Sequence, residues 1–232
     1  LGTGNIYSGL INQIRAPHTD YEPYLANKTK TKGLSFVDSI TVNKWNALLG
    51  IHYHSSDATT YNTAGRTTSR VIASATTPTY ALTYRPTDKI SVYGSHAEYF
   101  ESGTIVGSAY VNNTAVLPPA KTKQNEIGVK YRKDRISAGL SLFQIEQDRT
   151  MDVTYVGDAL PTTVMEGKNK LKGVELSVSG QIAPKWTLTG GLMHLATEQK
   201  TNTVLDGRGV SGIADWSGML AAEYAADAKT AA

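Results

Sequence analysis

Two histidines, His52 and His54, lie two positions apart in the sequence. On an extended strand such residues project from the same face, and two imidazoles on one face can begin a metal site. No third ligand stands nearby, so we interpret the pair as polar side chains lining an interior, and we predict no metal site. Glu98 and Glu101 have no spacing that indicates an acid–base pair. Without G-x-S-x-G, H-E-x-x-H or a phosphate loop, the sequence predicts no catalytic residue, no enzyme and no resident cofactor.

Ligand contacts are expected instead in the long polar stretches, because binding residues concentrate in connecting segments. Tyrosine offers rigid contact area with a hydrogen-bonding tip, and arginine suits anionic groups. The candidate ligand-binding residues are Tyr61, Arg66, Arg70 and Tyr110. Further candidates of the same kind are His18, Tyr21, Tyr24 and Arg208.

Nearly every regular segment alternates apolar and polar residues with period two, which is typical of strands with one apolar face. In 45–53, Trp45, Leu49 and Ile51 share one face, and His52 lies on the other. In 168–181, Val174, Leu176 and Val178 alternate with Glu175, Ser177 and Ser179. The facing of 90–100 is ambiguous. The predicted strands are 30–41, 45–55, 79–85, 90–100, 124–132, 135–156, 163–181, 185–197 and 214–224.

The lengths of the connections alternate along the chain. Tight turns are predicted at 42–44, 86–89, 133–134, 183–185 and 225–229. Long connections are predicted at 56–77, 101–123, 157–162 and 198–213. Short turns at one end and long loops at the other are typical of an outer-membrane barrel. The predicted fold is therefore all-β: an antiparallel, up-and-down transmembrane β-barrel whose apolar face meets lipid.

Four aromatic residues stand beside the predicted tight turns. Trp45 and Trp186 begin the strand after a turn, and Tyr84 and Tyr131 end the strand before one. Indoles and phenols at equivalent positions are typical of the aromatic belt at a membrane–water interface. We predict that these four residues are membrane-interface aromatics.

Composition narrows the function classes. The 232 residues carry 23 basic and 20 acidic side chains, a net charge of +3, which is too balanced to indicate nucleic-acid binding. No cysteine is present, so disulfides and thiol chemistry are excluded. The sequence contains no run of about 18 apolar residues, so no membrane-spanning helix is predicted. Both ends look cut, and we expect a piece of a longer protein.

Four segments resemble one known family, the TonB-dependent siderophore receptors of the ferrichrome and ferric-hydroxamate type. They are PTYALTYRPTDKISVYGSHAEYFESG at 78–103, LPPAKTKQNEIGVKYRKDRISAGLSLFQIEQ at 117–147, KLKGVELSVSGQIAPKWTLTGGLMHLAT at 170–197 and LDGRGVSGIADWSGMLAAEY at 205–224. The last segment departs from the family pattern, because Ser211 and Asp215 replace the usual Pro and His. The resemblance extends from about residue 31 to residue 224 in the order found in the family.

The resemblance implies energised import across the outer membrane of a Gram-negative bacterium. Such receptors bind a ferric siderophore from outside, and the TonB complex acts on a plug domain inside a barrel that is expected to be monomeric. About nine strands are predicted here, against about 22 in a plugged transporter. Residues 1–232 are therefore expected to be part of one barrel domain, without the plug and the closing strands. Two open sheet edges in lipid would cost several kcal/mol per unpaired group, so the chain alone is expected neither to insert nor to transport.

Two alternatives remain open. A passive porin-like channel or structural barrel would use the same strand pattern without a plug. A soluble β-sandwich that binds carbohydrate would use its Trp and Tyr residues to stack on sugars. The sequence does not specify which siderophore, or which other substrate, is bound.

Overall fold

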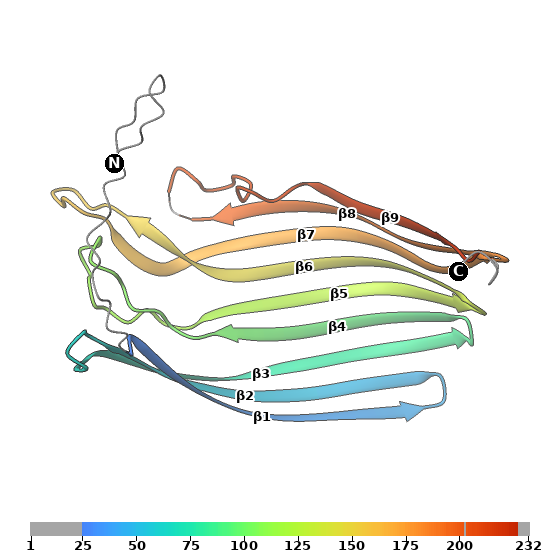
Figure 1. Ribbon diagram of the computed structural model, residues 1–232, viewed down its shortest axis with the longest axis horizontal. Coiled ribbons are helices and arrows are strands. Elements are labelled where there is room, and N and C mark those ends of the chain that lie inside the picture. The colour runs from blue at the N-terminus through green and yellow to red at the C-terminus, as the bar shows by residue number, and fades with distance from the viewer. Residues whose placement is uncertain (1–24, 202, 227–232) are drawn as a thin grey trace, which may run out of the picture.

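A computed structural model describes residues 25–201 and 203–226, which form one nine-stranded antiparallel sheet in the order β1 to β9 (Figure 1). Each strand pairs with the next along the chain, so the all-β, up-and-down prediction is confirmed. The described residues leave β1 and β9 with one unpaired edge each, and the sheet is not closed. The strands are β1 (Asn27–Val42), β2 (Trp45–Tyr61), β3 (Thr67–Thr87), β4 (Ile90–Glu101), β5 (Ala120–Lys133), β6 (Ile136–Val153), β7 (Thr162–Ala183), β8 (Trp186–Lys200) and β9 (Trp216–Tyr224).

Tight turns close one end of the sheet, as predicted. Ala183 pairs with Trp186, so Pro184 and Lys185 alone connect β7 to β8. Proline fits the second position of a type II turn, and Lys185 has the positive φ of 74° that the third position requires. The turns after β1 and β5 likewise use Asn43 and Asp134 at φ 53° and 51°, residue types that tolerate this conformation. The predicted turn at 225–229 lies mostly outside the described residues.

The first long connection is shorter than predicted. The prediction of a connection over 56–77 is wrong, because β2 continues to Tyr61 and β3 begins at Thr67. The remaining loop is held by Asn62, whose Oδ1 accepts hydrogen bonds from the amides of Ala64 (3.1 Å) and Arg66 (2.9 Å). Apolar and polar residues do not alternate in 56–77 because both faces of the strands are polar there. The backbone hydrogen bonds between β2 and β3 nevertheless continue. Strands that leave a membrane no longer need an apolar face.

The other three long connections are confirmed with small shifts of their bounds. They span 102–119, 154–161 and 201–215, and all lie at the end opposite the tight turns (Figure 1). The predicted strand 135–156 ends earlier, at Val153. A bulge between Arg149 and Met151 already disturbs its pairing with β7.

The two faces of the sheet differ in chemistry from the tight turns to about the middle of the long strands. We call the face that carries Leu49, Leu140 and Leu176 the apolar face, and the opposite face, with His52 and Glu175, the polar face. Cross-strand register aligns these sets; one apolar row joins Val129, Leu140, Leu176 and Leu192. Apolar side chains remain open: Leu49 is 54% exposed, Ile51 51% and Leu176 50%.

No second layer covers the apolar face within the described part of the chain. No large side chain there is fully buried, and the buried apolar residues are few: Val71, Val106, Leu117, Ala120, Met151 and Leu195. A β-sandwich needs a second sheet about 10 Å away. The residues described here form one sheet only. The apolar face therefore needs a partner that these residues do not supply.

Residues 25–201 and 203–226 include no helix with the length and hydropathy needed to cross a membrane.

Candidate functional site: a wall with an apolar and a polar face

At the tight-turn end, aromatic residues line the apolar face. Trp45 pairs with Tyr84, with ring centroids 4.5 Å apart, and Trp186 pairs with Tyr224 at 5.0 Å. Tyr131 lies on the same face, opposite Ile90 of β4. The structure thus brings the four predicted aromatics to one end of one face, as a membrane-interface belt requires.

The apolar band ends toward the long loops in polar and aromatic residues. On β2 it ends at Tyr53, beyond which Ser55 and Asp57 follow on the same face. Histidine–aromatic stacks mark this boundary between β3 and β4 and between β8 and β9: His96 lies on Tyr80 at 4.8 Å, and His194 on Trp216 at 4.5 Å. His96 Nδ1 also lies 2.8 Å from the Asn125 side-chain oxygen. Gln144 and Lys172 continue the row on β6 and β7.

A ladder of alternating charges lies just beyond this boundary. Cross-strand register places acidic and basic residues alternately on five neighbouring strands: Glu98, Lys123, Glu146, Lys170 and Glu198. The Lys123–Glu98 and Lys170–Glu146 pairs have N–O distances of 3.6 and 3.5 Å. Exposed pairs of this kind contribute about 0–1 kcal/mol each. The ladder mainly shows that the apolar face stops abruptly and a charged, hydrated zone begins.

Arg70 and Asp57 form a second charged feature in the same zone. Arg70 Nε and Nη2 donate to the two carboxylate oxygens of Asp57 at 2.8 and 2.7 Å, a bidentate arrangement. These hydrogen bonds lower the pKa of Asp57; partial desolvation opposes them, and the charges of Arg70, Lys30 and Lys32 add to them. The pair lies beyond the apolar band and is open to water.

Replacement of Arg70 is expected to raise the Asp57 pKa. Because the folded-state pKa is depressed, the pair's stabilising contribution is present above the ordinary carboxyl pKa and is lost as the pH falls through the folded value. In Arg70→Met the Asp57 pKa should move up toward its ordinary value of 3.8. Infrared titration of the carboxylate, with Asp57→Asn to assign the band, measures this. Arg66→Met is the control and should leave the titration unchanged; equal titrations in wild type and Arg70→Met would contradict the pairing.

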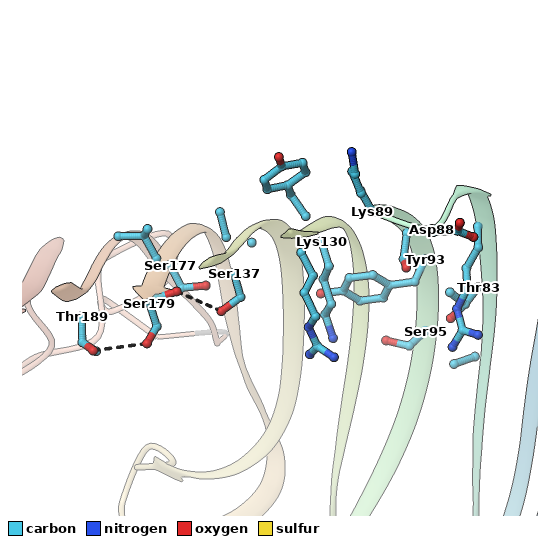
Figure 2. A pocket seen from close by; sticks show the side chains of 18 of the residues that line it. Thr83, Asp88, Lys89, Tyr93, Ser95, Lys130, Ser137, Ser177, Ser179 and Thr189 are labelled. Atoms are coloured by element: carbon cyan, nitrogen blue, oxygen red, sulfur yellow. Dashed lines mark hydrogen bonds between the residues drawn. The ribbon is translucent and has the colours of Figure 1, made fainter. Parts of the chain in front are cut away.

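The polar face carries a broad hollow of about 940 Å³ near the tight-turn end (Figure 2). Its lining comes from β3 through β8 and their turns, so the sheet is concave on this face. Hydroxyl groups are linked across strands: Ser137 Oγ donates to the Ser179 carbonyl at 3.2 Å, and Ser179 Oγ lies 3.2 Å from Thr189 Oγ1. Basic side chains, Arg85, Lys89, Lys130 and Arg132, make up most of the charge of the lining.

Tyr93 occupies the middle of this hollow (Figure 2). Its hydroxyl donates to Glu126 of β5, and Lys130 Nζ lies 4.6 Å from its ring centroid, a cation–π contact. The ring lies across Gly128, where an added Cβ would meet two ring carbons and the hydroxyl oxygen of Tyr93, each at 2.7 Å. A side chain at position 128 would displace the ring, so glycine lets Tyr93 bridge β4 and β5.

This cluster was missed in the sequence because the facing of 90–100 is ambiguous there. The available signal was the alternation on β5 and β7, which places Glu126 and Glu175 on the polar face. Charged residues facing the interior of a predicted barrel indicate that the interior is hydrated or filled by polar protein.

His52 and His54 lie on the polar face, as predicted. His52 Nδ1 is 2.8 Å from Ser35 Oγ, and the His54 ring lies 5.5 Å from the ring of Phe100. No group of three or more metal-binding side chains occurs in the described ranges. The pair is therefore accounted for by local contacts.

The four candidate ligand-binding residues do not form one cluster. Tyr61 and Arg70 line the same shallow depression of about 360 Å³ at the ends of β2 and β3, together with Lys28, Lys30 and Asp57. By register this depression continues the apolar face, beyond Tyr53. Arg66 lies in the loop after β2, and Tyr110 lies in the 102–119 loop, where its hydroxyl donates to Asp152 at 3.3 Å. His18, Tyr21 and Tyr24 lie outside the described residues.

A single curved sheet, apolar on its convex side, polar on its concave side and bounded by aromatic residues, defines a class: the wall of a transmembrane β-barrel. Comparison with known proteins gives the family. The family model described as TonB dependent receptor-like, beta-barrel, matches residues 2–230, and the chain belongs to this family. Its members are β-barrels of the Gram-negative outer membrane, which places this chain there.

Similar proteins include several siderophore receptors. The ferrichrome receptor FcuA of Yersinia enterocolitica is 26% identical over 217 residues, which is 88% of this chain and 28% of the relative. The ferrichrome outer membrane transporter/phage receptor of Escherichia coli K12 is 24% identical over 228 residues, 93% of this chain and 30% of the relative. The crystal structure of BauA, the ferric preacinetobactin receptor from Acinetobacter baumannii, matches with a TM-score of 0.71 and 30% identity, covering 95% of this chain and 33% of that one. The chain thus spans about a third or less of the length of these proteins.

Proposed function

We propose that this chain is part of the barrel wall of a receptor that imports ferric siderophores with energy supplied through TonB. The observation that carries the proposal is the family match over residues 2–230, together with relatives named for ferrichrome and other ferric siderophores. The ferric siderophore is cargo rather than a resident cofactor. The chain's own part is to separate lipid from a polar interior. Neither an enzymatic step nor a bound cofactor is assigned to it.

Residues 1–232 form part of one barrel domain in this proposal. The open edges of β1 and β9 support it, because strands from elsewhere in the parent protein are needed to satisfy their backbone groups in lipid. A plug domain of the parent protein fits the concave polar face, where Glu126, Lys130 and Glu175 can meet polar partners. The closed barrel acts as a monomer, and the TonB complex acts through the plug.

Ligand recognition is assigned to the long-loop end. Tyr110 and Arg66 are placed in loops there, whereas Arg70 is already paired with Asp57. Tyr61, Arg66, Arg70 and Tyr110 remain the proposed contacts, and alanine at all four positions tests them together. A weaker affinity of the parent receptor for ferrichrome would support these four residues as ligand contacts. An unchanged affinity would contradict the assignment.

Uptake of radioactive iron as ferrichrome by iron-starved cells tests the function. Cells with the intact parent gene should accumulate iron, and cells without the gene, or without TonB, should not. Accumulation that persists without TonB and shows no saturation would identify the passive channel instead. No dependence on the gene with any ferric siderophore would contradict the proposal.

A further inference from the structure

The 102–119 loop between β4 and β5 has a fold of its own. Ile105 and Val116 form an isolated antiparallel bridge, with Val106 N donating to Ala115 O and Leu117 N to Thr104 O, both at 2.9 Å. Val106 and Leu117 are 4% and 7% exposed, so the loop is anchored by its own apolar side chains. The loop is thus a small hairpin rather than an irregular excursion.

One side chain of this hairpin joins it to a distant part of the chain. Asn112 Nδ2 donates to the carbonyl oxygen of Thr163 at 2.8 Å, and the Thr163 amide donates back to Asn112 Oδ1 at 3.2 Å. The carboxamide therefore replaces the pair of bonds that a neighbouring strand would make to Thr163. Two further bonds lie beside it: Val111 N to Pro161 O at 3.0 Å and the Tyr110 hydroxyl to Asp152.

The Thr163 side of this junction is buried, and Asn112 itself is half-buried. Thr163 is 6% exposed, and Met151, whose carbonyl lies 3.5 Å from Thr163 Oγ1, is 7% exposed. Hydrogen bonds in such a site compete little with solvent, and a buried amide or carbonyl that loses its partner carries the full cost of desolvation. Asn113, the next residue, has only a backbone bond, to Tyr110 O.

We propose that Asn112 is a positioning residue that holds the β4–β5 hairpin on the first residues of β7, beside the Val111–Pro161 bond to the β6–β7 connection, so that the two long loops form one preorganised part of the binding rim. Asn112 touches no ligand in this account. Asn112 restricts the conformations of the loop before a ligand binds. Less conformational entropy is then lost on binding, which raises the affinity without any new contact. The effect on ligand affinity rests on the proposed function, because that function supplies the ligand. The junction between Asn112 and Thr163 does not depend on it.

Loop mobility tests the junction without a ligand. The chain has no cysteine, and a Cβ at Gly107 would meet nothing within 4 Å, so Gly107→Cys in a cysteine-free parent receptor accepts a spin label. Asn112→Ala should increase the mobility of the label. Asn112→Asp, which keeps the shape but turns a carboxylate oxygen toward the Thr163 carbonyl, should do the same. Asn113→Ala is the matched control and should leave the spectrum unchanged.

Transport kinetics with ferrichrome test the consequence for binding. Losing the two bonds should weaken affinity about tenfold and raise the apparent KM of uptake, while the maximal rate and the heat-modifiable barrel stay as in wild type. Equal label mobility in Asn112→Ala and Asn113→Ala would overturn the junction. A mobile loop with unchanged affinity would overturn its role in binding. If the wild-type receptor binds no ferric siderophore, both the proposed function and the role of Asn112 in binding fail. The label mobility in the Asn112 variants still shows whether the junction between Asn112 and Thr163 exists.

Discussion

Leu140→Arg is expected to lower the free energy of unfolding of the parent barrel in lipid bilayers by about 2–4 kcal/mol. Leu140 lies midway along the apolar stretch of β6, between Ala138 and Leu142 on the same face, and is 49% exposed. A guanidinium at this depth must be withdrawn from water or must drag water into the hydrocarbon. Urea titration of the refolded receptor in vesicles measures the loss.

Gln144→Arg is the matched control for this change. It places the same side chain on the same strand and face, four residues farther on, at the polar boundary with Asn125 and Lys172. At this position the loss in the free energy of unfolding should be only about 0–1 kcal/mol. Equal costs at the two positions would show that depth in a membrane does not govern the apolar face.

Gly128→Val is expected to destabilise the barrel by about 1–3 kcal/mol or more through overpacking. The first added carbon already meets the Tyr93 ring at 2.7 Å, and the ring must leave both its bond to Glu126 and its contact with Lys130. The change should appear as a lower temperature for loss of the heat-modifiable form on gels.

Gly191→Ala provides the control, because a Cβ there meets only the Leu176 carbonyl at 3.7 Å. It should be nearly neutral. Tyr93→Ala combined with Gly128→Val should recover part of the loss, since the clash disappears. A full additive loss in the double variant would contradict the proposed packing of the ring over the glycine.

The sequence predicted the sheet well because one face is mostly apolar between the tight turns and the polar boundary. Where Leu, Ile and Val alternate with Ser, Glu and His, period-two patterning determines both strand and facing, as in β2 and β7. The prediction was wrong over 56–77, since Thr, Ser and Ala alternate without changing hydropathy and pairing there rests on the backbone. The ambiguity at 90–100 concealed Tyr93, whose role depends on the glycine opposite it.

Contacts within the site were less predictable than the fold. The Asp57–Arg70 pair and the Asn112–Thr163 junction join residues 13 and 51 positions apart, through turns and loops whose lengths the pattern does not determine. The common position of Trp45, Tyr84, Tyr131 and Trp186 at one end of the sheet was predictable because each residue lies beside a turn. Their location at a membrane interface stays a prediction.

The central claim is that lipid lies against the apolar face and that water or polar protein lies against the other. Spin labels placed singly from Ala138 to Phe143 of the cysteine-free parent receptor in membranes test it most directly. Collision rates with dissolved oxygen, which concentrates in hydrocarbon, should peak at Ala138, Leu140 and Leu142 and drop at Gly139, Ser141 and Phe143. Rates without this alternation, or with peaks at the second set, would contradict the account.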